Sequence, residues 1–181
     1  KGGKGDIIPV DKIDLNALRG RVVLITGPNS GLGLETVRRI ASVEPKFIFV
    51  CRPGAPKEKL SEIPSTAIFD VDLADFNSIR SFVPRYKAAG LPPIDVLILN
   101  AGVISGKGEK TAQGIELTVG VNYFGAFAFT NELLKSGLFP GKRDSGGWVP
   151  RVIAIASEGH RLARRIDPVR VLVPMFFAES Y

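Results

Sequence analysis

Short apolar runs alternate with longer amphipathic patterns along most of this chain. The runs are apolar at successive positions rather than at every second one, which is typical of strands covered on both faces of a parallel sheet. Such strands are expected at residues 22–25, 47–51, 67–69, 96–99 and 152–156. Helical periodicity is expected at residues 32–41, 76–89 and 115–134. Strands separated by helices imply right-handed crossovers, so the pattern predicts an α/β fold with a doubly wound parallel sheet.

A glycine-rich stretch, Thr26-Gly27-Pro28-Asn29-Ser30-Gly31-Leu32-Gly33, joins the first strand to the first helix. Glycines let a backbone turn tightly and approach a ligand, and the N-terminus of the following helix offers free amides to a pyrophosphate. Such a turn in isolation is only a weak indication, but here it lies between a strand and a helix. We therefore expect a Rossmann-type sheet of order 3-2-1-4-5 with this turn at its carboxyl edge. The candidate cofactor-binding residues of the turn are Gly27, Asn29, Ser30, Gly31, Leu32 and Gly33.

The second strand ends in Cys51-Arg52, with no Asp or Glu beside it. In dinucleotide folds an acidic residue near this point binds the ribose 2′-hydroxyl of NAD, whereas an arginine suits the 2′-phosphate of NADP. The sequence therefore favours NADP(H) over NAD(H), with Arg52 as the residue that would bind the 2′-phosphate. The alternative is that Arg52 is an ordinary surface residue.

Polar residues also follow the remaining strands. The third strand leads to Asp72-Leu73, the fourth to Asn100-Ala101-Gly102, and the fifth ends at Ser157. Asn122 lies in an apolar part of the long helical pattern, so we expect it to face inward and to be hydrogen-bonded.

Length and composition limit the remaining choices. The 181 residues suit one domain, with residues 1–20 as a partly loose extension and residues 21–181 as the nucleotide-binding unit. No run approaches the length of a membrane span, and the polar N-terminus is unlike a signal peptide. Cys51 is the only cysteine, so we expect no internal disulfide and no metal site. A reducing intracellular compartment fits, whether the cytosol or an organelle interior such as a plastid.

The net charge is +6, and Arg161, Arg164, Arg165 and Arg170 contribute to an excess late in the chain. This excess suits a solvated surface loop, or alternatively an acidic partner or a cofactor phosphate nearby. Aromatic residues are not interleaved with it, so nucleic acid is not expected as a partner.

Taken in order along the chain, these motifs resemble those of the short-chain dehydrogenase/reductase family. The motifs are Thr26-Gly27-x-x-x-Gly31-x-Gly33, Asp72-Leu73, Asn100-Ala101-Gly102, Val121-Asn122-x-x-Gly125 and Ser157. Three further stretches are similar to the branch that holds retinol dehydrogenases and protochlorophyllide reductases: Cys51-Arg52, Gly114-Ile115-Glu116-Leu117-Thr118 and Ser157-Glu158-Gly159-His160. The resemblance implies an NADP(H)-dependent oxidoreductase that transfers hydride to or from a lipophilic carbonyl- or alcohol-type substrate.

The resemblance also implies individual roles. Asp72 and Leu73 would border the adenine, and Asn100, Ala101 and Gly102 would line the ribose and nicotinamide. Asn122 would hold a proton-relay water, and Ser157 would hydrogen-bond the substrate oxygen. The family's catalytic tyrosine normally begins a Tyr-x-x-x-Lys motif, in which the lysine lowers the tyrosine pKa.

This sequence contains no complete Tyr-x-x-x-Lys motif, and Tyr181 is its last residue. Either the motif starts at Tyr181 and is cut off, or it does not exist here. On the first reading the chain is the N-terminal portion of an enzyme, lacks the family's C-terminal strands and is not competent alone. The alternative is a catalytically degenerate, dehydrogenase-like scaffold subunit of a larger assembly.

On either reading, the last predicted strand is expected to have an uncovered apolar edge. Residues 152–156 are apolar on both sides, as in an interior strand, yet no later strand is evident to cover them. We expect missing sequence, the apolar segment 169–177 or a partner protein to cover this surface.

Overall fold

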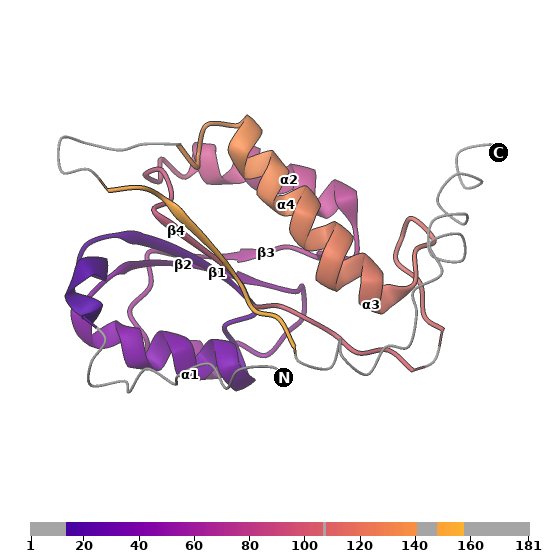
Figure 1. Ribbon diagram of the computed structural model, residues 1–181, viewed down its shortest axis with the longest axis horizontal. Helices are drawn as coiled ribbons and strands as arrows, with labels where there is room; N and C mark the ends of the chain where they lie inside the picture. Colours follow the sequence, from indigo (N-terminus) through magenta and orange to yellow (C-terminus); the bar gives the residue numbers. More distant parts are fainter. Residues whose placement is uncertain (1–13, 107, 141–147, 158–181) are drawn as a thin grey trace, which may run out of the picture.

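The computed structural model describes residues 14–106, 108–140 and 148–157 of the chain. Parallel strands form one five-stranded sheet in the order β3-β2-β1-β4-β5 (Figure 1). The strands are β1 (Val22–Thr26), β2 (Lys46–Cys51), β3 (Ala67–Asp70), β4 (Val96–Leu99) and β5 (Arg151–Ala154). The predicted fold class and strand order are confirmed.

Helices cover both faces of this sheet (Figure 1). The helix α1 (Gly31–Ile40) packs on one face, and α2 (Phe76–Ala88) and α4 (Ala126–Lys135) pack on the other. The shorter elements are η2 (Leu15–Leu18), η3 (Ala41–Val43), η4 (Glu58–Leu60), α3 (Leu117–Val119) and the π-helical turn η5 (Gly120–Gly125). Within the described ranges, no helix has both the length and the apolar character needed to cross a bilayer.

Strand β1 is buried along its whole length and divides the interior into two cores. Side chains alternate across a strand, so Val22 and Leu24 belong to the core under α2 and α4, whereas Val23 and Ile25 belong to the core under α1. The continuous apolar run in the sequence thus reflects burial on both faces rather than on one.

Aromatic rings fill the core under α2 and α4. The ring of Phe82 lies 5.1 Å from that of Phe69, 5.5 Å from that of Tyr86 and 5.0 Å from that of Phe129, measured between centroids. Tyr86 is fully buried and its hydroxyl donates to the Pro92 carbonyl at 2.6 Å. Phe82 therefore joins β3, α2 and α4 in one cluster.

The helical pattern expected at residues 115–134 forms α3, η5 and α4 in succession rather than one regular α-helix. Glycines at both ends of η5 allow close packing. A Cβ at Gly120 would overlap the Thr111 methyl group, and one at Gly125 would overlap the Leu73 carbonyl oxygen. The π-helical turn therefore lies tightly between two loops at the carboxyl edge of the sheet, a context in which such turns are often functional.

The opposite, amino edge of the sheet is held by Asp95, which is 2% exposed. Its carboxylate accepts the Val22 amide at 2.8 Å, and its carbonyl accepts the Arg151 amide at 3.0 Å. The Arg21 guanidinium lies 3.9 Å from the same carboxylate and 4.5 Å from the centroid of Trp148. Trp148 packs against the core under α1.

Strand β5 forms one edge of the described sheet, where β4 is its only partner. It covers residues 151–154 rather than the expected 152–156. Val152 and Ile153 are 45% and 43% exposed, although both are apolar. The expected uncovered surface is therefore present in the part of the chain that the structure describes, while residues 161–165 and 169–177 lie outside it.

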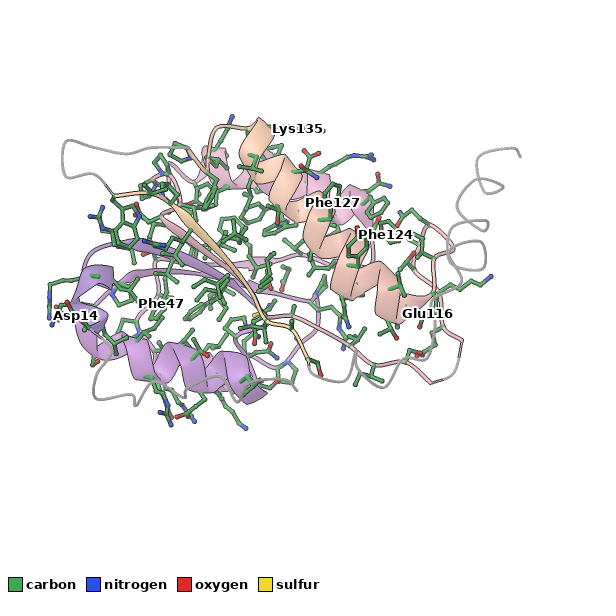
Figure 2. The ribbon with its side chains drawn as sticks, viewed as in Figure 1. Asp14, Phe47, Glu116, Phe124, Phe127 and Lys135 are labelled. Atoms are coloured by element: carbon green, nitrogen blue, oxygen red, sulfur yellow. The ribbon has the colours of Figure 1, made fainter. Side chains whose placement is uncertain are left out.

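The aromatic cluster predicts a contrast between two phenylalanines. Phe82→Ala should lower the free energy of unfolding by about 3–5 kcal/mol, because it leaves a cavity at a fully buried ring. Phe127→Ala is the matched control: this ring is 62% exposed on α4 (Figure 2), so the loss should be about 0.5 kcal/mol or less. Urea denaturation measures both, and similar losses for the two variants would contradict this account of the core.

Candidate functional site

A cleft of about 650 Å³ opens at the carboxyl ends of the strands. Segments that follow β1, β2, β3 and β4 line it, together with Ile155 beyond β5. In a doubly wound sheet, ligands bind at this edge, where the strand order reverses. Strands β2 and β4 lie on either side of β1, so the cleft is at that reversal.

The glycine-rich turn lines the cleft where α1 begins. Gly27 and Gly31 have φ of +66° and +54°, values in the left-handed region that favours glycine. Gly33 has a different reason: a Cβ there would overlap both the Gly27 carbonyl oxygen and the Asn100 side-chain nitrogen. The turn therefore forms a cradle that requires glycine at these three positions.

The first turn of α1 supplies amides to this cradle. Ser30 is the N-cap residue, but its side chain makes no capping hydrogen bond. Amides in the first turn of a helix have no partner within the helix, so this end is suited to an anion. Leu32 lines the cleft close by and is 72% exposed.

Thr26 and Asn100 lock the turn to the end of β4. The Thr26 hydroxyl oxygen accepts the amides of Asn100 at 3.1 Å and Ala101 at 3.0 Å. In return, the Asn100 side-chain nitrogen donates to the carbonyls of Thr26 and Gly27, at 3.0 and 2.9 Å. Asn100 thus shapes the cleft through its neighbours, and Gly27 approaches Ala101 so closely that a Cβ would lie 3.0 Å from the Ala101 Cα.

Arg52 and Asp72 line the cleft beyond the adjacent strands β2 and β3. Arg52 is exposed, and no ion pair is found for it among the described residues. The Asp72 carboxylate accepts the Ala74 amide at 2.8 Å, which fixes the loop that follows β3. Leu73 is buried next to Gly125, so the end of β3 and the π-helical turn meet at this side of the cleft.

Cys51 precedes Arg52 and faces the core under α1 rather than the cleft. Burial raises the pKa of its thiol to about 11, against the opposing effect of Lys57 and with a small further rise from Asp70. The thiol is therefore protonated at neutral pH, and Cys51 has a packing role.

A hairpin formed by residues 109–117 contributes to the wall of the cleft, and sequence reasoning missed it. The Leu117 amide donates to the Glu109 carbonyl at 2.8 Å, and the Thr111 amide donates to the Ile115 carbonyl at 2.8 Å. Lys110, Thr111 and Ala112 line the cleft. Thr111 and Gly114 (φ +77°) form the turn of this hairpin, and their residue types could have predicted a turn here. They could not have predicted that the hairpin lines the cleft.

Glu116 joins this hairpin to α3 as its N-cap residue. Its carboxylate accepts the amides of Thr118 at 3.0 Å and Val119 at 2.9 Å. Partial desolvation raises the pKa of Glu116, but these amide hydrogen bonds outweigh it, so the pKa lies below its usual value. Glu116 therefore stays ionised as a cap at neutral pH.

Asn122 was expected to face inward, and this expectation is wrong: it is exposed on η5. The expected hydrogen bonding is present. Its side chain accepts the Val103 amide at 2.8 Å and donates to the Val103 carbonyl at 2.8 Å. Two such bonds satisfy the amide without burial, and they hold the loop that follows β4 next to Gly102.

The structure brings most of the sequence-predicted residues to one cleft. Those that line it are Gly27, Asn29, Ser30, Leu32, Arg52, Asp72, Leu73, Asn100, Ala101 and Gly102. Gly31 and Gly33 shape the turn, whereas Asn122 and Ser157 are not among the lining residues. Tyr181 lies outside the described residues. Thr26, Ala74, Asp75, Lys110 and Thr111 line the cleft without having been singled out as site residues.

The parallel sheet with its glycine cradle defines a doubly wound α/β protein of the dinucleotide-binding class. The chain belongs to the short-chain dehydrogenase family, whose model matches residues 21–163. Polyprenol dehydrogenase of Danio rerio and retinol dehydrogenase 11 of Homo sapiens are each 34% identical to it over an alignment of 154 residues, and each match covers 81% of this chain. These similarities identify the retinol dehydrogenase-like branch of the family. The matched region covers only 46% of each of these two relatives.

A solved structure gives the same fold. A short-chain dehydrogenase from Escherichia coli CFT073, in complex with NADPH, superposes with a TM-score of 0.61. The two chains are 21% identical, and the match covers 91% of this chain and 69% of the other. At this identity the similarity establishes the fold. Members of the family bind nicotinamide cofactors.

Thr26 gives a test of how the cleft is built. Thr26→Val should lower the free energy of unfolding by about 2 kcal/mol or more, because two amides lose their shared acceptor. Thr26→Ser keeps the hydroxyl and loses one methyl group, so its loss should be about 1 kcal/mol or less. Denaturant unfolding of both variants checks this. A serine variant as unstable as the valine variant would show that the hydroxyl is not the stabilising group.

Proposed function

We propose that this chain forms the cofactor-binding part of an NADP(H)-dependent oxidoreductase acting on a lipophilic alcohol or carbonyl substrate. The observation that carries the proposal is the glycine cradle at the start of α1, where a Cβ at Gly33 would fill the space beside Gly27 and Asn100. Because the turn has no side chains at these glycines, a pyrophosphate could approach its backbone and the N-terminal amides of α1. When bound, the nicotinamide would supply or accept the hydride.

The choice of NADP(H) rests on the end of β2. Arg52 lines the cleft at the position where an acidic residue would bind the ribose 2′-hydroxyl of NAD(H). Asp72, the acidic residue beyond the neighbouring strand, already accepts the Ala74 amide. At the end of β2 the sequence Cys51-Arg52-Pro53-Gly54 holds no acidic residue, so a 2′-phosphate at this point would meet an arginine.

The lipophilic substrate class rests on the relatives. By their names, two 34% identical relatives act on polyprenol and retinol, which are both long-chain, apolar alcohols. Leu32 and Ile155 add exposed apolar surface to the cleft, at 72% and 49% exposure. In this proposal Ser157 binds the substrate oxygen, Asn122 orients a proton-relay water, and Tyr181 exchanges the proton.

A second candidate is a scaffold subunit whose partner covers the apolar edge at β5. The exposed Val152 and Ile153 favour it, because an edge strand with apolar side chains is a ready surface for pairing. In the enzyme reading, further sequence of the same protein covers this edge. Catalysis by the full-length protein separates the two candidates.

The cofactor preference is tested at Arg52. Arg52→Ala should weaken NADPH binding about tenfold or more and leave NADH binding nearly unchanged, because an arginine–phosphate contact contributes roughly 1.5–3 kcal/mol. Arg80→Ala, at an exposed position of α2, removes the same charge away from the cleft and should change neither affinity. Fluorescence titration with both cofactors measures this. Equal losses for NADPH and NADH in the Arg52 variant would disprove the assignment.

Catalysis is tested with the full-length protein, NADP⁺ and retinol or a polyprenol. We expect formation of NADPH, and Tyr181→Phe should reduce the rate by roughly 10²-fold or more while leaving NADPH affinity unchanged, because proton transfer is lost. Absorbance of the reduced nicotinamide follows the reaction. A protein that binds NADPH but shows no hydride transfer with either alcohol would favour the scaffold instead.

A further inference from the structure

Lys110 is a second cation on the wall of the cleft, and the hairpin holds its backbone in place. It pairs with Glu116 in an antiparallel bridge, and Glu116 in turn caps α3. Figure 2 places Glu116 at the start of α3 and Lys135 at the far end of α4. Lys110 therefore lies at the end of this helical segment that borders the cleft.

The hairpin is also joined to the loop that follows β3. The Ala112 amide donates to the Ala74 carbonyl at 3.2 Å, and the Gln113 side-chain nitrogen donates to the Asp75 carboxylate at 3.3 Å. Thr111 packs so closely on Gly120 that a Cβ there would overlap its methyl group. The hairpin that carries Lys110 thus contacts the loop that follows β3, and β3 pairs with β2 up to the register partners Cys51 and Asp70.

The carboxylates around Lys110 already have partners. Asp72 accepts the Ala74 amide, and Asp75 accepts the amide of Asn77 as well as the Gln113 side chain. Glu109 accepts the Ser105 hydroxyl, and Glu116 accepts two amides of α3. In residues 14–106, 108–140 and 148–157, neither Arg52 nor Lys110 forms an ion pair. The cleft is therefore lined by two cations without an ion-pair partner in these ranges, one directly after β2 and one on the hairpin that contacts the loop after β3.

We propose that Lys110 is a second ligand of the 2′-phosphate of NADP(H), acting together with Arg52. This inference rests on the proposed function. The amides of α1 already match the pyrophosphate beside β1, whereas the ribose 2′ position belongs to the end of β2, near the loop of β3 to which the hairpin is joined. A phosphate monoester carries about −1.5 to −2 charges at pH 7, so a single arginine leaves it incompletely neutralised.

The test compares Lys110→Gln and Lys110→Arg with a matched control, Lys135→Gln, in the full-length protein. Lys110→Gln should weaken NADPH binding roughly three- to tenfold, as expected for loss of a charge-assisted contact at a partly exposed site, and leave NADH binding unchanged. Lys110→Arg should keep most of the NADPH affinity. Lys135→Gln, an equal change of charge at an exposed position of α4, should have no effect.

Fluorescence titration with NADPH and NADH separates the outcomes. Equal weakening of both cofactors by Lys110→Gln would place the contact on their shared part and overturn the proposal. No change in either affinity would overturn it as well. If Arg52→Ala lowers the NADPH preference and Lys110→Gln leaves it unchanged, only this inference fails. If the unsubstituted protein binds neither cofactor, the proposed function fails with it.

Discussion

The lock between Thr26 and Asn100 is the contact on which the architecture of the cleft depends. The Thr26 hydroxyl oxygen accepts two amides from the residues that follow β4, and the Asn100 side-chain nitrogen donates to one carbonyl of β1 and one of the glycine turn. These hydrogen bonds hold β1 and β4 together at their carboxyl ends, beside the cleft. They also explain why Gly33 tolerates no side chain, because Asn100 already occupies the space that a Cβ would need.

The remaining walls of the cleft are built onto this centre by close backbone contacts. The π-helical turn packs through Gly120 on the hairpin and through Gly125 on the loop after β3. The hairpin is then tied to that loop by Ala112 and Gln113. Acidic side chains in these walls accept hydrogen bonds from neutral donors and keep their negative charge, whereas Arg52 and Lys110 form no ion pair among the described residues. The amides at the start of α1, which have no partner within the helix, suit an anionic occupant.

The amino edge of the sheet is covered by side-chain contacts, whereas the edge formed by β5 is exposed. Asp95, Arg21 and Trp148 close the amino edge with buried hydrogen bonds and a cation–π contact. Strand β5 has a single neighbour in the described sheet and exposes Val152 and Ile153. The chain spans about half the length of the curated relatives it matches. Any structural account of the whole protein therefore has to explain what packs against this apolar edge.

The sequence by itself determined the sheet, its strand order and the glycine turn. Strands buried on both faces must be apolar at successive positions, as in Val22, Val23 and Leu24, and a tight phosphate-type turn needs glycine. The exposure of Asn122 and the place of Lys110 were decided by tertiary structure. Asn122 finds its hydrogen bonds on a neighbouring loop, so burial was not required. Lys110 reaches the cleft because a hairpin folds back onto the end of β3, and contacts between segments distant in sequence leave no local periodic pattern.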